Sequence, residues 1–291
     1  MNRPVNILTV DLEEWFVVEA LAGRFDFDDW PGLPSTLPRN TERLLRLFHR
    51  HDVRATWFIL GWCAEQHPQI IRMIAEAGHE IACHSHRHRR VDRLTPEEFR
   101  GDVERSVRAI FEACEIRPRG FRAPSWSLNE STPWAFDILA ELGFEYDSSI
   151  FPIKHDLYGV PNGPRHLIRM TCADGRHLFE QPASTIRFLG QNHPMGGGGY
   201  LRHSPYWYSR SMIRRVNRTG YPVVVYLHPW EIDPDLPAVP GLSPLQRFRT
   251  YGSTDVFEDK LSRLLAEFEF TTMIDFIHAS TRQKIGFETR P

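Results

Sequence analysis

The feature that most constrains the fold is a repeated alternation of short apolar runs and amphipathic segments. The apolar runs are rich in β-branched residues, as in VNILTVD (5–11), ATWFILG (55–61), PVVVYLH (222–228) and TTMID (271–275). Segments with helical periodicity, such as ERLLRLFHRH (42–51), lie between such runs. Apolar strands that alternate with helices are typical of a parallel sheet covered by helices. We therefore predict an α/β fold whose sheet is either closed into a barrel or open.

The segment from Thr95 to Cys114 carries the clearest helix signal. Thr95 is a typical N-cap, Pro96 suits the first helical position, and Glu98 completes a capping box. Apolar side chains recur along one predicted face of this helix, at Phe99, Val103, Val107, Ile110 and Phe111.

Polar side chains follow the predicted strands at the points where the strands end. These ends read VDLEEW, CHSHRH, FRAPSW, EYDSS and YLHPWE, and each contains acids, imidazoles or an arginine. In parallel βα folds the chemistry collects at the carboxyl ends of the strands. We therefore expect these segments to converge on one site.

The histidines of GHEIACHSHRHRRV (78–91) predict a metal site. His is a common ligand of divalent metals, and His84 and His88 can share one ion if the segment turns into a helix. His86 would then point elsewhere. The alternative is a solvated basic loop, but the position at a strand end and the nearby acids favour the metal site.

The acids Asp11, Glu13 and Glu14 follow the first predicted strand. Along an extended strand Asp11 and Glu13 point to one face, so one carboxylate can bind a cation while the other stays free as a general base. A bulge at the strand end would exchange Glu14 for Glu13. In the plainer alternative, these acids cap the following segment.

Arg122 and His228 follow two further strands. An arginine one strand away could pair with a catalytic carboxylate and keep it ionised. A histidine opposite that base could protonate a leaving amine. The alternatives are an exposed ion pair for Arg122 and a core histidine for His228, which is packed beside Pro229 and Trp230.

Composition limits the partners and the compartment. The net charge of −2 gives no reason to expect nucleic acid or an anionic membrane as partner. The four cysteines are widely spaced and form no CxxC pair, which suits reduced thiols. The sequence shows neither a secretion signal nor a long apolar span. We expect a soluble cytoplasmic protein.

Five motifs in chain order resemble the polysaccharide deacetylase family, the carbohydrate esterases (family 4 type) built around the nodulation-type chitooligosaccharide deacetylase domain. The motifs are TVDLEE, HSHRH, RAPS, YDSS and YLH, and they lie between residues 9 and 230. The resemblance implies a distorted (β/α) barrel of about seven parallel strands. We expect one domain over residues 1–291, in which residues 232–291 form a C-terminal extension packed on the barrel.

The resemblance also implies a metal centre. Glu13 is similar to the family's carboxylate ligand, and His84 and His88 are similar to its two histidine ligands. We expect Zn²⁺ by preference, although ligand type alone separates it poorly from Co²⁺ and Ni²⁺.

The same resemblance implies the catalytic residues. Asp11 would be the base, Arg122 would hold it, His228 would be the acid, and Asp147 lies in the fourth motif. The expected reaction is the metal-assisted hydrolysis of an N-acetyl group on an amino sugar within an oligosaccharide or polysaccharide. A backbone N–H near Ser125 would stabilise the oxyanion, and aromatic rings would stack on sugars, namely those of Trp126, Tyr158 and Trp230.

The chain departs from the common family pattern in its first motif. The family has two adjacent aspartates, whereas here the pair is spaced and Glu13 stands at the ligand position. A minority branch that includes allantoinase-like amidases has this spacing, so hydrolysis of a small cyclic amide stays an alternative. A glycan-binding scaffold without turnover is a second one. The stretches YDSSIFPIKHDLYG, GGGGY and GLSPLQRFRTYGS are more similar to the branch associated with exosortase and exopolysaccharide loci.

Overall fold

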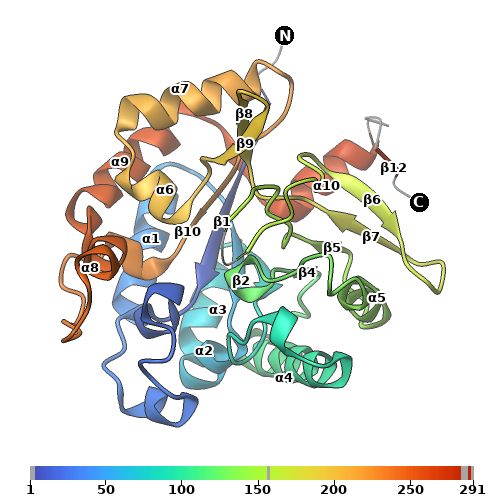
Figure 1. Ribbon diagram of the computed structural model, residues 1–291. Coiled ribbons are helices and arrows are strands. Elements are labelled where there is room, and N and C mark those ends of the chain that lie inside the picture. Colours follow the sequence, from blue (N-terminus) through green and yellow to red (C-terminus); the bar gives the residue numbers. More distant parts are fainter. Residues whose placement is uncertain (1–3, 156–157, 283–287, 290–291) are drawn as a thin grey trace.

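The computed structural model describes residues 4–155, 158–282 and 288–289. Its centre is a curved sheet with the strand order β10-β1-β2-β3-β4-β5-β7-β6-β12, with β11 beside β1 (Figure 1). The strands are β1 Asn6–Leu12, β2 Thr56–Ile59, β3 Glu80–Cys83, β4 Gly120–Phe121, β5 Tyr146–Asp147, β6 Ile168–Thr171, β7 His177–Glu180, β8 Thr185–Phe188, β9 Gln191–Pro194, β10 Val224–Leu227, β11 Phe270–Thr271 and β12 Glu288–Thr289.

The strands from β10 to β7 along this order pair in parallel, and they number seven. No ladder joins β10 to β12 among the described residues, so the sheet forms an incomplete barrel. The prediction of a distorted α/β barrel with about seven parallel strands is confirmed.

Helices cover the outer surface of this sheet (Figure 1). The α-helices are α1 Leu37–Arg50, α2 Gly61–Gln66, α3 Pro68–Glu76, α4 Pro96–Cys114, α5 Trp134–Glu141, α6 Gly198–His203, α7 Tyr206–Asn217, α8 Pro244–Tyr251, α9 Thr254–Glu267 and α10 Met273–Arg282. Short 3-10 helices are η1 Trp15–Val17, η2 Glu19–Leu21, η3 Phe27–Gly32, η4 Val91–Arg93, η5 Pro124–Trp126 and η6 Pro229–Ile232. Within the described ranges, no helix is both long and apolar enough to cross a membrane.

The start of α4 confirms the predicted capping box. The Thr95 side chain accepts from the backbone N–H of Glu98, and the Glu98 carboxylate accepts from that of Thr95. The predicted apolar face is wrong at one position, because Phe111 is 50% exposed. At 100° per residue Phe111 lies about 120° around the helix from Phe99, at the margin of the buried stripe.

Two other parts of the chain differ from the prediction. The strand expected at 271–275 ends at Thr271, and Thr272 instead caps α10 by accepting from the backbone N–H of Asp275. Residues 168–194, for which the apolar pattern predicts no element, contain two antiparallel pairs, β6 with β7 and β8 with β9. β7 adds this region to the parallel sheet by pairing with β5.

Candidate active site

The predicted site residues lie at the carboxyl edge of the sheet. β1, β2 and β3 run in parallel, with Asp11 paired to Phe58 and Ile59 to Cys83. Glu13 directly follows β1 and His84 directly follows β3, so the register brings both side chains to the same edge. All seven residues of β1 are buried because β10 and β2 flank it, and the acids at its end are therefore held inside the protein.

Glu13, His84 and His88 form a compact group of ligand atoms. One such atom from each residue lies within 4.8 Å of the other two. The Glu13 Oε2 lies 3.5 Å from Nε2 of His84 and 2.7 Å from Nε2 of His88.

His84 and His88 come together without the helical turn that the i, i+4 spacing would allow. The segment forms no helix, and Ser85 and His88 have positive φ angles of 63° and 51°. Two left-handed residues thus bring the imidazoles together, with ring centroids 5.3 Å apart. His86 points elsewhere, with its ring against Gly61 and Glu65.

The hydrogen bonding of His84 shows that this group fits a cation. The Nδ1 of His84 lies 2.8 Å from the carbonyl oxygen of Arg122, which can only accept, so Nδ1 carries the proton in the neutral ring. Its Nε2 then presents a lone pair to the Glu13 carboxylate. Two acceptors facing each other inside a protein are unfavourable, and a divalent ion between them would relieve the conflict.

Glu13 is ionised in this setting. Burial raises the pKa of its carboxyl, but the positive charges of His88 and His228 outweigh burial. The pKa of Glu13 therefore lies well below its ordinary value. Glu14 is not part of the group with His84 and His88, and it accepts hydrogen bonds from the Ser35 hydroxyl and the Thr36 backbone N–H.

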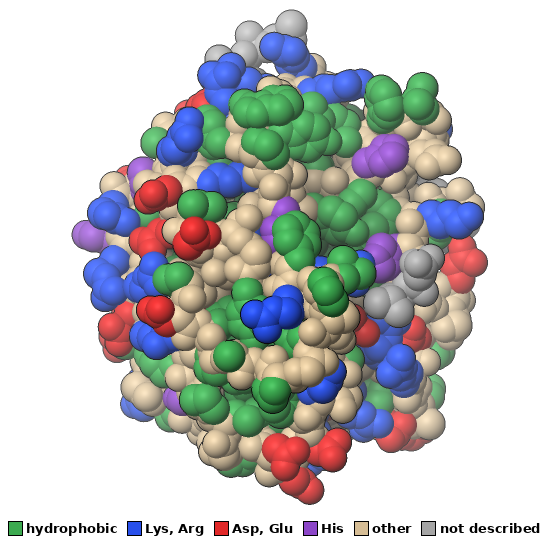
Figure 2. Space-filling view, turned by 60° about the vertical axis from the view of Figure 1, so that its left-hand side comes forward, with side chains coloured by type: hydrophobic (Ala, Val, Ile, Leu, Met, Phe, Trp, Pro, Cys, Tyr) green, Lys and Arg blue, Asp and Glu red, His purple; other side chains and the backbone are tan. Residues whose placement is uncertain are grey.

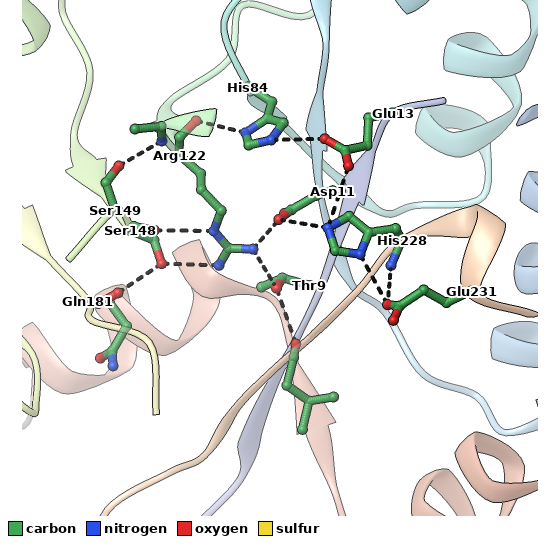
Figure 3. Close-up of polar contacts among 12 residues, drawn as sticks. Thr9, Asp11, Glu13, His84, Arg122, Ser148, Ser149, Gln181, His228 and Glu231 are labelled. Atoms are coloured by element: carbon green, nitrogen blue, oxygen red, sulfur yellow. Dashed lines mark hydrogen bonds and ion pairs between the residues drawn. The ribbon is translucent and has the colours of Figure 1, made fainter. Parts of the chain in front are cut away.

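Asp11 lies beside this group and is held by Arg122 (Figure 3). The Nη1 of Arg122 donates to Oδ1 of Asp11 at 2.6 Å and to the Thr9 hydroxyl at 2.9 Å. The guanidinium also donates to the backbone and side-chain oxygens of Ser148, and it lies over the ring of Phe58 at 4.0 Å. Arg122 is fully buried, so the alternative of an exposed ion pair is excluded.

Asp147 lies behind the site, and in the part of the chain that the structure describes no hydrogen bond or ion pair joins it to His84 or His88. It accepts from the backbone and side chain of Ser149, whose hydroxyl oxygen in turn accepts from the Ala123 backbone N–H. These contacts fix the segment next to Arg122. They fit a positioning role for Asp147 rather than direct contact with a substrate.

His228 faces the two acids from the end of β10. Its Nε2 lies 3.9 Å from Oδ2 of Asp11 and 3.7 Å from Oε1 of Glu13. Burial lowers the pKa of His228, but Glu13, Glu231 and Asp11 outweigh burial and raise the pKa to about 9. His228 is therefore protonated at neutral pH in the metal-free protein.

Glu231 is a site residue that the sequence reasoning missed. Its Oε2 lies 3.0 Å from both Nδ1 and the backbone N of His228. Its Oε1 accepts from Nε of Arg202, at 3.0 Å, and both of these side chains are buried. The available signal was the acid three residues after the histidine in HPWE, which allows a capping box within η6.

One cavity of about 910 Å³ joins these residues to the surface. Every predicted site residue lines it except Arg122 and Asp147, which lie behind its wall. Ser125 and Trp126 line the cavity and have positive φ angles of 53° and 52°. The Ser125 hydroxyl donates a hydrogen bond to the Glu19 carboxylate. Tyr158 and Trp230 complete the predicted set, with Trp230 stacked on His228 at 5.3 Å.

Comparison with known proteins agrees with this geometry. Residues 25–146 match the polysaccharide deacetylase family, and residues 148–278 match a domain of unknown function (DUF3473). Residues 25–146, less than half of the chain, are thus similar to the polysaccharide deacetylase family. This confirms the family resemblance seen in the five motifs.

Two curated relatives match part of this chain. A peptidoglycan deacetylase of Helicobacter pylori is 32% identical over 108 residues, which are 37% of this chain and 36% of the relative. A chitooligosaccharide deacetylase of Bradyrhizobium is 35% identical over 115 residues, which are 39% of this chain and 48% of the relative. The matched region thus spans less than half of either relative.

Solved structures show the same fold over the whole chain. A Mycobacterium smegmatis protein assigned as a polysaccharide deacetylase aligns with a TM-score of 0.63 and 21% identity, covering 100% of this chain and 96% of that one. A CE4 family pseudoenzyme from Bacillus anthracis aligns with a TM-score of 0.51 and 14% identity, covering 100% and 68%. Since the fold includes a pseudoenzyme, activity has to be argued from the site residues.

Proposed function

We propose that this protein is a metal-dependent N-deacetylase that removes acetyl groups from an N-acetylated amino sugar in a polysaccharide or its precursor. The observation that supports it most is the lone pair of His84 Nε2 directed at the ionised Glu13, beside a carboxylate held by a buried arginine. Relatives named for peptidoglycan and chitooligosaccharide deacetylation support the substrate class.

Glu13, His84 and His88 would hold the metal ion. A bound divalent ion supplies Lewis acidity toward water and toward the acetyl carbonyl. Zn²⁺ suits one carboxylate and two imidazoles, and Co²⁺ and Ni²⁺ suit the same ligands. The ligand set leaves room for water and substrate, because three protein ligands are typical of catalytic sites.

Asp11 accepts the proton of the attacking water in this proposal. Arg122 occupies its Oδ1, so Oδ2 is the oxygen that faces the cavity beside His228. The buried guanidinium fixes the direction of the carboxylate. A backbone N–H at Ser125 would face the developing oxyanion, since this turn lines the same cavity.

His228 protonates the leaving amine in this proposal. It carries a proton at neutral pH, and Glu231 accepts from its Nδ1 so that Nε2 faces Asp11 and Glu13. A cation bound by Glu13 would offset the negative charge next to His228, so His228 would release its proton more easily. One group that accepts a proton and one that donates it thus lie next to each other, beside the ligand group.

The cavity and the contacts around it also favour a polysaccharide deacetylase over the two alternatives, a cyclic amidase and a scaffold without turnover. Drug-sized ligands fit pockets of about 300–1,000 Å³, and a small cyclic amide is smaller than such ligands. The cavity of about 910 Å³ is therefore larger than a small cyclic amide would fill. A scaffold without turnover would need none of the contacts between Asp11, Arg122 and His228. The exopolysaccharide setting and the cytoplasmic location stay predictions from the sequence.

The test is acetate release from N-acetylated oligosaccharides, with metal analysis of the same preparation. We expect acetate release to follow the bound metal and to stop after exhaustive chelation. Full activity in the chelated protein would contradict the metal centre. A metal-loaded protein that releases no acetate from any N-acetylated glycan would contradict the deacetylase assignment.

A further inference from the structure

Exposed apolar side chains from three helices lie at the mouth of the cavity. They come from α6, the first turn of α7, and α8, all within residues 148–278, the part that matches a domain of unknown function. Trp207 is 67% exposed, Leu245 56% and Phe248 54%, and Tyr200 and Tyr208 are also exposed. All five line the same cavity, and we call them the cavity rim. Exposed apolar side chains that gather in this way mark surfaces that bind a protein or a membrane.

The segments that supply the rim carry positive charge and no acidic residue. Residues 181–230 contain six arginines and neither Asp nor Glu, although the whole chain has a net charge of −2. Residues 236–254, which include α8, also lack Asp and Glu and contain Arg247 and Arg249. Figure 2 shows Lys and Arg side chains beside groups of hydrophobic side chains on this side of the molecule. This part of the chain is therefore cationic, while the protein as a whole is not.

Helix α7 presents aromatic and cationic side chains on one exposed face. At about 100° per residue, Arg218 lies about 20° and Arg215 about 80° around the helix axis from Trp207. The opposite side of the helix is buried through Ile213 and Val216. The exposed face thus carries an aromatic ring at the start of the helix and two arginines near its end.

Three arginines of this surface are available to anions from outside the protein. Arg215, Arg218 and Arg249 are exposed, and among the described residues no ion pair includes any of them. Two other arginines of α7 pair with Glu267 on α9, which shows that the helix separates paired from available cations. Arg249 also lines the cavity, so an available positive charge lies directly beside the rim.

These features favour an anionic membrane surface over other partners. Aromatic and aliphatic side chains enter the headgroup boundary of a bilayer, and arginines bind the phosphates of anionic lipids. A second copy of this chain in a two-fold contact would use the same patch, so the arginines of both copies would face one another. A soluble polyanion would neutralise the arginines but leave Trp207 and Leu245 in water.

We propose that the cavity rim and the exposed face of α7 dock on a membrane that contains anionic phospholipids. The apolar side chains of the rim enter the headgroup boundary, and the three available arginines contact lipid phosphates. The cavity then opens toward the membrane, because the rim lies at its mouth. One consequence rests on the proposed deacetylase function: the enzyme acts on a glycan precursor that a lipid anchor holds at the membrane. The docking itself requires no turnover.

Co-sedimentation with lipid vesicles measures this docking. Vesicles of phosphatidylcholine and phosphatidylglycerol in equal parts are compared with vesicles of phosphatidylcholine alone. We expect tighter binding to the anionic vesicles, and Arg215→Gln/Arg218→Gln should weaken it about 20-fold, since each arginine at an anionic surface contributes about fivefold. Arg72→Gln/Arg108→Gln is the matched control, because it removes the same charge from exposed positions on α3 and α4, which line no part of the cavity. Binding of this control should stay close to that of the unaltered protein, since its charges lie away from the docking surface.

The apolar contacts are tested in the same assay. Trp207→Ala should lower the affinity for anionic vesicles at least about tenfold, because it removes a large apolar side chain from the bilayer boundary. Phe111→Ala, which removes an exposed ring from α4, should leave the affinity unchanged. Phospholipids brominated in the acyl chains should quench the tryptophan fluorescence of the bound protein. Trp207→Phe should retain vesicle binding and lose most of this quenching, which identifies the side of the protein that meets the bilayer.

Several outcomes would overturn the inference. They include no binding to anionic vesicles, and equal binding of all variants. Binding of inorganic polyphosphate that equals vesicle binding and is unchanged in Trp207→Ala would assign the surface to a soluble polyanion. A dimer in solution that Trp207→Ala dissociates, without vesicle binding, would assign it to a second copy. Vesicle binding by a protein that releases no acetate would support the docking and contradict only the proposed deacetylase function.

Discussion

The carboxylate of Asp11 and the guanidinium of Arg122 meet at 2.6 Å inside the sheet, and both side chains are almost completely buried. They lie 111 positions apart in the chain, on β1 and directly after β4. Because Arg122 binds Oδ1 of Asp11, Oδ2 is the oxygen that faces the cavity. The same contact contributes to the stability of the fold.

Asp11→Asn should retain the metal and abolish acetate release. Asparagine keeps the size of the side chain but cannot accept a proton, and general-base catalysis contributes about 10²–10⁴-fold. Acetate release and metal content are measured on the same sample. A variant that turns over normally would show that another group is the base.

Arg122→Met should destabilise the fold by about 3–5 kcal/mol, because it leaves Asp11 buried without its partner. Urea unfolding measures the free energy of unfolding. The control is Arg119→Met, since Arg119 forms an exposed pair with Glu145 that is worth no more than about 1 kcal/mol. The double variant Asp11→Asn/Arg122→Met should recover part of the loss, and an equal loss in all three variants would refute this account.

His84→Ala should lose both metal and activity, because it removes one of three ligands. His86→Ala is a useful comparison, since the ring of His86 lies outside the ligand group. Metal stoichiometry by mass spectrometry is the measurement. Full metal occupancy in His84→Ala would place the ion elsewhere.

Glu231→Gln should move the alkaline limb of the kcat profile to lower pH. The charge of Glu231 helps to raise the pKa of His228 to about 9, so removing it lowers that pKa and the acid form is lost earlier as pH rises. Glu231→Asp keeps the charge and should keep the limb closer to that of the unaltered enzyme. Glu258→Gln, on an ion pair with Arg43, is the control distant from the cavity. An unchanged alkaline limb in Glu231→Gln would mean that Glu231 does not act on His228.

The stability of the protein should fall on acidification because of His79. Burial, with a smaller effect of Arg54, lowers the pKa of His79 to about 4, against about 6.5 in the unfolded chain. Between these pH values the unfolded state binds a proton on His79 that the folded state does not bind. The contribution of His79 to the free energy of unfolding is therefore complete above pH 6.5 and is lost as pH falls toward 4. The loss from pH 7 to pH 5 is about 2 kcal/mol for this group.

Urea unfolding at both pH values tests this prediction. His79→Asn should lower the pH dependence by about that amount. The exposed His49→Asn should not change it, since that side chain stays in water in both states. An identical pH dependence in His79→Asn and the unaltered protein would rule the mechanism out.

The sequence by itself determined the α/β fold and most of the residues that meet in the site. Continuous apolar runs indicate buried strands, and the polar residues that follow them mark the carboxyl edge of the sheet. Parallel strands bring all of these ends to the same edge. The geometry of residues 84–88 could not be predicted in this way, since left-handed φ angles at Ser85 and His88 leave no periodic signal. The antiparallel pairs β6–β7 and β8–β9 could not be predicted from the apolar pattern either.

Only the tertiary structure decided which polar groups face one another. It directs Glu13 to the histidines and Glu14 to Ser35, and it places Asp147 behind Arg122. It also brings Arg202 from α6 onto Glu231, and so connects α6 to His228. The physical reason is that such contacts depend on side-chain direction and on packing between segments distant in the chain, whereas local sequence encodes only which residues each segment offers.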